Sequence, residues 1–223
     1  MTSHPVVRVY LVRHGETNEN RMRIIQGQMD TDLNLGGVDQ ARLCGEALKD
    51  VRFCLAFTSD LKRAFKTAEL IMQYHPNVKL VQHVGLRERY MGELQGVRVG
   101  GYDRSKLPKS VETSEAFTRR TLAWWEEAIG QHLPNISIPP GSEPLHVLAV
   151  SHGAFIASLC QVLVMAKVIE APPDMFFGRC FNTSITTIDM RVDKCGTLLK
   201  YCDVSHLAQP ALETNADAEL KPN

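Results

Sequence analysis

The stretch VYLVRHGETNEN (residues 9–20) decides the predicted fold, because its apolar run ends abruptly in an arginine, a histidine and a glycine. Residues 6–12 are apolar and β-branched without a helical period, which predicts a strand buried on both faces. Arg13 and His14 would then lie where this strand emerges into solvent. An ordinary strand end explains such a pair equally well, so its interpretation depends on partners elsewhere in the chain.

Strand-like and helix-like segments alternate along the rest of the chain. This alternation predicts an α/β fold with three layers, α/β/α, around an open, mostly parallel central sheet. We expect a single domain over residues 1–207, a functional lid at about 92–114 and a disordered tail at 208–223. The patterns predict helices after residue 37 and at 61–72, 117–129 and 154–165, and strands at 54–57, 78–84, 146–150, 184–192 and 198–204.

Three chemically capable residues follow three different predicted strands. His14 follows the first strand, Arg63 lies in the first turn of the helix after the second, and His152 follows the strand at 146–150. In open α/β sheets, ligands bind in a crevice at the carboxyl ends of the strands. We therefore expect His14, Arg63 and His152 to converge despite their separation in sequence.

Two arginines and two histidines at one crevice suit a phosphoryl group. Planar guanidinium groups bind phosphate oxygens in pairs, and a neutral imidazole can attack phosphorus through one ring nitrogen. We expect His14 to be the nucleophile and Arg13, Arg63 and His152 to surround the oxygens.

A leaving alkoxide needs a proton, and a carboxyl group can supply it. Glu88, within LRERYMG (residues 86–92), is the expected donor and afterwards the base that activates water. Glu93 remains a rival for this role.

The segment Leu11–Thr17 with Asn20 resembles the signature of the histidine phosphatase superfamily, the phosphoglycerate-mutase-like clan. Four further segments resemble the blocks of that family in the same order: residues 32–41, 59–67, 86–96 and 150–153. The resemblance covers roughly residues 6–206 and implies a phosphoglycerate-mutase-like fold. It implies the same roles for His14, Arg13, Arg63, His152 and Glu88, and the expected substrate-binding set is Asn20, Gln26, Gly27, Arg89 and Tyr90.

The choice within this family lies between phosphatase and mutase. Cofactor-dependent mutases carry a longer insertion before the second histidine, with an Arg-Arg pair that holds a second phosphate, and this insertion is not evident here. Arg119 and Arg120 are adjacent on a predicted helix, so they point about 100° apart and are expected on a solvated face. The locally basic segment 92–114 could still meet a second anionic group on the substrate. The chain looks closest to the fructose-bisphosphatase-like and broad-range phosphatase branches, with Asn182 expected behind the pocket.

The predicted function is therefore hydrolysis of small phosphomonoesters, such as sugar phosphates or bisphosphates, through a phosphohistidine on His14. A cofactor-dependent phosphoglycerate mutase is one alternative. A regulatory protein that binds or dephosphorylates a phosphorylated protein partner is the other.

Composition gives no bulk attraction to other partner classes, because 25 acidic residues balance 25 basic ones. We expect no nucleic-acid or membrane partner, and a small phosphorylated metabolite as the ligand. Six cysteines without a C-x-x-C pair predict reduced, mostly buried thiols, and the absence of a signal sequence predicts a cytoplasmic protein. The oligomeric state has no signature in the sequence.

Neither a cofactor nor a metal is implied by this mechanism. Asp30 and Asp32 could be mistaken for the carboxylates of a magnesium-dependent aspartate phosphatase. Such carboxylates would directly follow an apolar strand, whereas these follow the polar residues 26–29. A turn and a helix cap explain them better.

Overall fold

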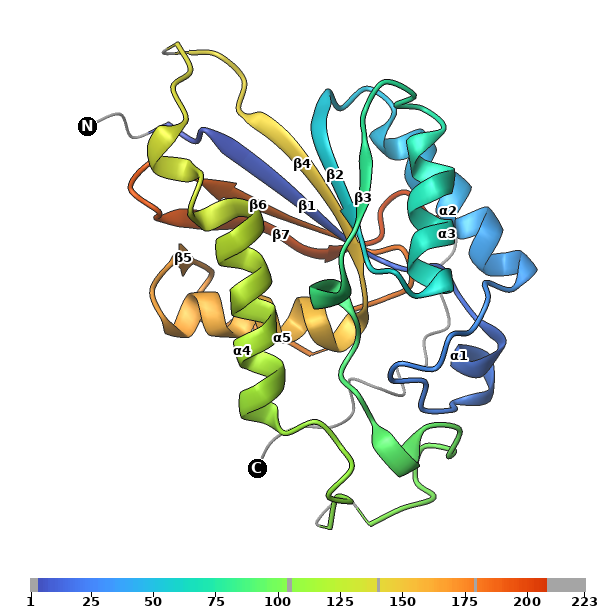
Figure 1. Cartoon of the computed structure of the whole chain (residues 1–223). Coiled ribbons are helices and arrows are strands. Elements are labelled where there is room, and N and C mark those ends of the chain that lie inside the picture. The colour runs from blue at the N-terminus through green and yellow to red at the C-terminus, as the bar shows by residue number, and fades with distance from the viewer. Residues whose placement is uncertain (1–3, 104–105, 140, 179, 208–223) are drawn as a thin grey trace.

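A computed structural model describes residues 4–103, 106–139, 141–178 and 180–207. Its strands form one sheet in the order β3-β2-β4-β1-β6-β7-β5 (Figure 1). The strands are β1 (Val7–Arg13), β2 (Phe53–Thr58), β3 (Leu80–Gln82), β4 (Leu145–Ser151), β5 (Ile169–Glu170), β6 (Ile185–Met190) and β7 (Gly196–Asp203). β6 is antiparallel to its neighbours β1 and β7, and the other pairings are parallel. The predicted mostly parallel α/β fold is confirmed.

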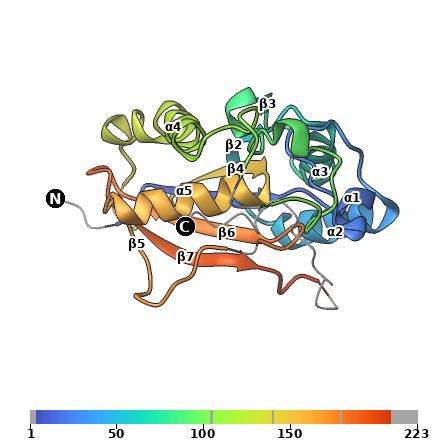
Figure 2. The ribbon, with the colours of Figure 1, turned by 90° about the horizontal axis from the view of Figure 1, so that it is seen from below.

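Helices cover both faces of this sheet, as the view from below shows (Figure 2). The helices are α1 (Asn18–Met22), α2 (Leu35–Leu48), α3 (Lys62–Met72), α4 (Ser114–Trp125) and α5 (Gly153–Met165). α4 and α5 pack against one face, together with Val9 and Leu11 of β1, whereas α2 and α3 pack against the other, together with Val12. This alternation along β1 is that of a strand buried on both faces, and it produces the three predicted layers.

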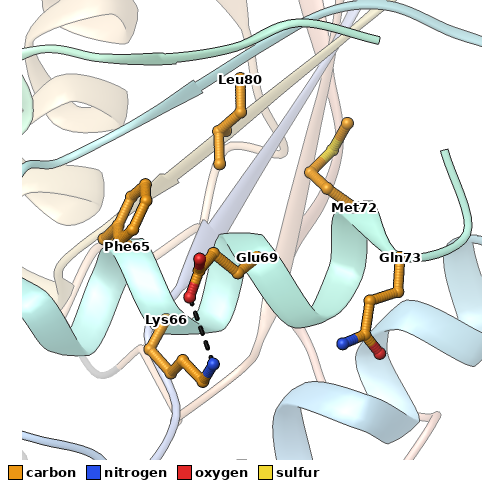
Figure 3. Close-up of a pocket in the computed structure, with 6 residues that line it drawn as sticks. All are labelled: Phe65, Lys66, Glu69, Met72, Gln73 and Leu80. Carbon is orange, nitrogen blue, oxygen red and sulfur yellow. Dashed lines mark hydrogen bonds and ion pairs between the residues drawn. The ribbon is translucent and has the colours of Figure 1, made fainter. Parts of the chain in front are cut away.

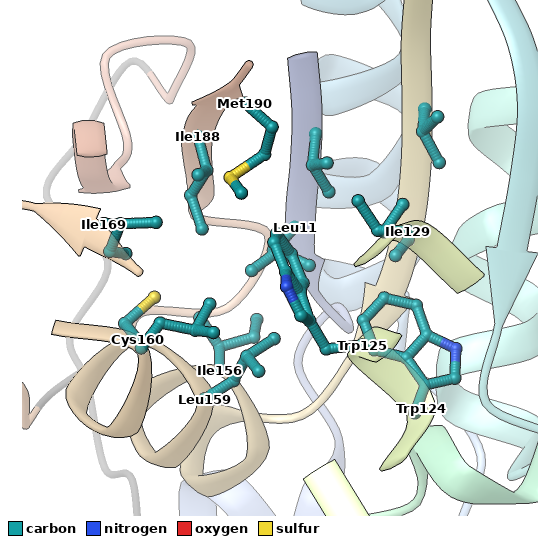
Figure 4. Close-up of a cluster of buried hydrophobic side chains, with 14 of the residues drawn as sticks. Leu11, Trp124, Trp125, Ile129, Ile156, Leu159, Cys160, Ile169, Ile188 and Met190 are labelled. Atoms are coloured by element: carbon teal, nitrogen blue, oxygen red, sulfur yellow. The ribbon is translucent and has the colours of Figure 1, made fainter. Parts of the chain in front are cut away.

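The larger core lies between the sheet and the helices α4 and α5 (Figure 4). Trp124 and Trp125 are almost fully buried there. The ring of Trp124 meets Phe155 of α5 edge to face, with 5.7 Å between the centroids. The tryptophans therefore anchor α4 to α5, in a geometry that aromatic pairs favour.

The short elements differ from the predictions. β3 covers only Leu80–Gln82 of the predicted strand at 78–84, and α4 starts at residue 114 and continues into a π-helical turn, Glu126–Gly130. α1 and β5 were not predicted, because five and two residues are too few to show a period. The tail at 208–223 lies outside the described residues.

The predicted lid has a small apolar cluster of its own. Ile25 packs there with Met91, Leu94 and Val111. The backbone amide of Ile25 donates to the carbonyl of Val97. The described part of segment 92–114 is therefore attached to the loop that follows β1.

All six cysteines are free thiols. Four of them are buried, as expected, but Cys54 is exposed and Cys195 is partly exposed. Where the structure describes the chain, no helix has both the length and the apolar character that a membrane span requires.

Two glycines allow the loop after β1 to lie directly against the start of α2. A Cβ on Gly37 would lie 2.1 Å from the carbonyl oxygen of Glu16, and one on Gly15 would lie 2.4 Å from that of Gly37. Neighbouring Gly36 differs, because its added Cβ would first meet the flexible end of the Arg21 side chain at 2.9 Å.

We predict that Gly37→Ala lowers the free energy of unfolding by about 1–3 kcal/mol, since backbone atoms must move to admit the methyl group. Gly36→Ala is the matched control in the same helical turn, and its effect should stay below about 1 kcal/mol. Urea denaturation of both variants measures the difference. Equal effects would contradict the proposed close approach.

Candidate active site

The register of the sheet brings the two predicted site histidines together. β1 and β4 are adjacent and parallel, and Arg13 pairs with Ser151 at their carboxyl ends. His14 and His152 each come one residue later, and their ring centroids lie 5.2 Å apart. Arg63 enters the same place from the first turn of α3, after β2 on the other side of β4. The expected convergence of three separate segments is confirmed.

His14 is held with one ring nitrogen available for nucleophilic attack. Its Nδ1 lies 2.7 Å from the carbonyl oxygen of Gly15, which can only accept, so Nδ1 is assigned the proton. Nε2 then carries the lone pair, and it accepts a hydrogen bond from Nε of Arg63 at 3.3 Å. Burial, followed by the charges of Arg63 and Arg13, holds the pKa of His14 well below 6.5. The ring is therefore neutral at physiological pH.

His152 is neutral for similar reasons. The side chain is fully buried, and its Nε2 lies 3.0 Å from the hydroxyl of Ser59. Burial is the largest cause that lowers its pKa well below 6.5, and the nearby charge of Arg63 adds to it.

Carbonyl oxygens hold the two buried arginines. Arg63 donates to the carbonyl of Met29 at 2.6 Å and to that of Gly27 at 2.7 Å. Arg13 donates to the carbonyl of Cys180 at 2.5 Å. These contacts orient the two guanidinium groups.

Glu88 is buried at the start of α5, the helix that follows His152. Its Oε2 accepts from the backbone amide of Ala154 at 3.0 Å, in the first turn of that helix, and its Oε1 accepts from the amide of Arg89 at 2.8 Å. Glu93, the rival, is exposed, and its carboxylate accepts from Ser110. Of the two carboxylates, Glu88 is the buried one, and it is bound to the helix that follows His152.

Asn20 lies in α1, and Gln26 and Gly27 lie in the loop that follows it. Asn20 and Gln26 are buried, and each accepts a hydrogen bond from Thr17. Gly27 contributes the carbonyl that binds Arg63. Asn182 lies behind His14, as expected, and donates to its carbonyl oxygen at 3.0 Å.

The other two residues of the expected substrate-binding set lie at the base of the lid. Arg89 donates through Nε to the carbonyl of Glu112 at 2.8 Å. The side chain of Tyr90 is 43% exposed. These two residues therefore lie farther toward the surface than Asn20 and Gln26.

The prediction that Arg119 and Arg120 share a solvated helix face is wrong for Arg120. Arg119 is exposed, but the Arg120 side chain is only 23% exposed and forms an ion pair with Glu112 at 2.9 Å. A signal was present in the sequence: Arg120 lies three residues after Phe117 and four before Trp124, both on the buried face. Adjacent side chains on a helix point about 100° apart, so Arg120 points inward while Arg119 points to solvent.

Asp30 is a helix cap, as predicted, although of a different helix. Its Oδ1 accepts from the amide of Lys62, the first residue of α3, at 2.8 Å. Asn34 caps α2 instead, by accepting from the amide of Gly37 at 2.8 Å.

A shallow hollow on the surface lies along α3 beside the edge strand β3 (Figure 3). It contains none of the predicted site residues, and is lined by Phe65, Lys66, Glu69, Met72, Gln73 and Leu80. The predicted site is instead the buried cluster at the carboxyl ends of β1 and β4.

A neutral histidine beside buried arginines, at the carboxyl edge of a mostly parallel sheet, suits phosphoryl transfer. Residues 9–203 match the family model of the histidine phosphatase superfamily (branch 1). The chain belongs to this superfamily, and it is accordingly a phosphoric monoester hydrolase.

Individual relatives agree with this assignment. An uncharacterized phosphatase, PhoE, of Bacillus subtilis is 33% identical over 190 residues, which are 83% of this chain and 90% of the relative. A broad-specificity phosphatase of Saccharomyces cerevisiae is 30% identical over 201 residues, 82% of this chain and 80% of the relative. The crystal structure of a phosphoglycerate mutase from Bacillus anthracis superposes with a TM-score of 0.75 at 27% identity, covering 91% of this chain and 96% of that one.

The two histidines of the site, both almost fully buried, predict a loss of stability in acid. The folded state keeps both rings neutral, whereas the unfolded chain takes up protons below about pH 6.5. Stability should therefore be full above pH 6.5 and fall below it, by up to about 1.4 kcal/mol per pH unit for each histidine.

Chemical denaturation between pH 7.5 and 5 measures this slope. The double variant His14→Gln/His152→Gln should show a shallower slope than the unaltered protein, and exposed His132→Gln is the control. Identical slopes for all three proteins would show that the buried rings take up protons as readily as the unfolded chain.

Proposed function

We propose that this protein hydrolyses small phosphomonoesters, such as sugar phosphates or bisphosphates, through a phosphohistidine on His14. The observation that carries the proposal is the state of His14: a buried, neutral ring with its proton on Nδ1 toward Gly15 and its lone pair on Nε2 beside Arg63. That tautomer is the one that can attack phosphorus.

In the first step, the substrate's phosphoryl group binds between His14 and Arg63. The Nε–H group of Arg63 then donates its hydrogen bond to a phosphoryl oxygen instead of to His14 Nε2. The lone pair of Nε2 is thereby left facing phosphorus. Arg13 and His152 bind the remaining oxygens. The Nε2–P bond forms as the P–O bond to the leaving group breaks, and the carbonyl of Gly15 stabilises the positive charge that develops on the ring.

Glu88 supplies the proton that the leaving alkoxide needs. In the second step the resulting carboxylate takes a proton from water, which attacks the phosphohistidine. The products are inorganic phosphate and His14 in its starting tautomer. The buried position of Glu88 next to the first turn of α5 supports its assignment over exposed Glu93.

The remainder of the substrate lies toward the base of the lid in this proposal. Asn20, Gln26 and Gly27 shape the phosphoryl site, and Arg89 and Tyr90 contact the group that carries the phosphate. We further propose a cytoplasmic location, since free thiols suit a reducing compartment.

The contacts of Arg120 favour phosphatase over mutase activity. A mutase of this family needs a second anion site, and Arg119 with Arg120 was the pair that the sequence offered. Arg120 is engaged with Glu112 and with backbone carbonyls. It is therefore not available to bind a second phosphate.

We predict that the protein releases phosphate from p-nitrophenyl phosphate in the presence of EDTA, and that His14→Ala lowers the rate by about 10³-fold or more. Exposed His132→Ala is the control and should keep full activity. Rapid acid-sensitive labelling of the protein by a ³²P-labelled substrate would detect the phosphohistidine. Full activity of His14→Ala would exclude the mechanism. Specific binding of a phosphoprotein without any turnover would favour the regulatory alternative.

We also predict that 3-phosphoglycerate, supplied with 2,3-bisphosphoglycerate, is hydrolysed faster than it is isomerised. The reason is that Arg120 is engaged with Glu112 and with backbone carbonyls instead of binding a second phosphate. Phosphorus NMR distinguishes the 2- and 3-phosphoglycerates from inorganic phosphate in one sample. Isomerisation that outpaces hydrolysis would make the protein a mutase.

A further inference from the structure

The backbone around Glu88 is held by side chains. Arg120 of α4 donates to three backbone carbonyl oxygens of this segment, those of Gly85 (3.0 Å), Arg87 (2.7 Å) and Glu88 (3.1 Å). The carbonyl between the first two, that of Leu86, accepts from Ser151 at 2.7 Å. Four consecutive carbonyls are thus bound by side chains from elsewhere in the fold.

Glu112 also binds the guanidinium group of Arg120 and so fixes its orientation. Its carboxylate accepts from Nε of Arg120 at 3.1 Å and from Nη2 at 2.9 Å. The same carboxylate accepts from the amide of Tyr90 at 3.0 Å, and the amide of Glu112 donates to the carbonyl of Tyr90 at 2.9 Å. The ion pair therefore joins the segment on both sides of Glu88 to the end of the lid.

The backbone carbonyl and the side-chain carboxylate of Glu88 are bound to two different helices, which pack against each other. Its carbonyl is held by Arg120 of α4, and its carboxylate is held by the amide of Ala154 in α5. Trp124 of α4 packs on Phe155 of α5 and sets the spacing between these helices. The position of the carboxylate thus depends on Arg120 as well as on α5.

We propose that Arg120 is a positioning residue that places the Glu88 carboxyl group for proton transfer to the leaving group, without itself touching the substrate. The inference rests on the proposed role of Glu88 as proton donor. Only a planar fork reaches three carbonyls and a carboxylate together, so a lysine of the same charge does not replace it.

Two substrates with different leaving groups test this role. p-Nitrophenolate departs without a proton, whereas the alkoxide of glycerol 2-phosphate requires one. The quantity to compare is kcat/KM, which reports events up to departure of the leaving group. Glu88→Gln, the reference variant, should lose about 10²-fold or more with glycerol 2-phosphate and far less with p-nitrophenyl phosphate.

Arg120→Gln and Arg120→Lys should show the same selectivity, with at least about tenfold more loss for the alkyl than for the aryl substrate. Inhibition by inorganic phosphate should be unchanged in both, because the phosphoryl site is built by other residues. The matched control is Arg119→Gln, one position away and exposed. It should behave as the unaltered protein with both substrates.

The outcomes separate the inference from the proposed function. Equal losses for the two substrates in the Arg120 variants, or no loss at all, would overturn the positioning role. Equal losses in Glu88→Gln would instead remove the premise that Glu88 is the donor. Should Arg120→Gln not fold, Glu112→Gln weakens the same ion pair from the partner side. Glu112→Gln should show the same leaving-group selectivity to a smaller degree. A Glu112→Gln variant without this selectivity would equally overturn the inference.

Discussion

The site depends on holding two like charges close together inside the protein. Arg13 and Arg63 are buried beside His14, and carbonyl oxygens hold both guanidinium groups. Burial, together with the charges of these arginines, holds the pKa of His14 well below 6.5. Its ring is therefore neutral, as the proposed nucleophile must be.

The sheet register determines where this field can be built. Because β1 and β4 are parallel neighbours paired at Arg13 and Ser151, His14 and His152 leave the sheet side by side. The loop after β1 then has to turn against the start of α2, where Gly15 and Gly37 leave no room for a side chain. A tight backbone contact thus fixes the loop next to His14, the proposed nucleophile.

The features that could be predicted from the sequence are periodic elements and residues that come directly after a strand. Buried strands and amphipathic helices have periods, so the layers and the convergence of His14, Arg63 and His152 could be predicted. The inward face of Arg120 also had a signal, its spacing from Phe117 and Trp124. Its partners had none, because its hydrogen bonds to Glu112 and to the carbonyls of residues 85, 87 and 88 are tertiary contacts. The caps that Asp30 and Glu88 provide to helices elsewhere in the chain are of the same kind. Such hydrogen bonds join distant segments and leave no local pattern.

The two halves of the proposed reaction are consequently built in different ways. The phosphoryl site lies on strand ends and a helix start, where regular backbone hydrogen bonds set the positions. Glu88 lies on an irregular segment that owes its shape to side chains, chiefly Arg120. The Arg120–Glu112 ion pair extends that segment into the lid, which faces the variable part of the substrate in this proposal. If Glu88 is the donor, as proposed, changes in the lid should alter proton transfer to particular leaving groups while phosphate binding stays intact.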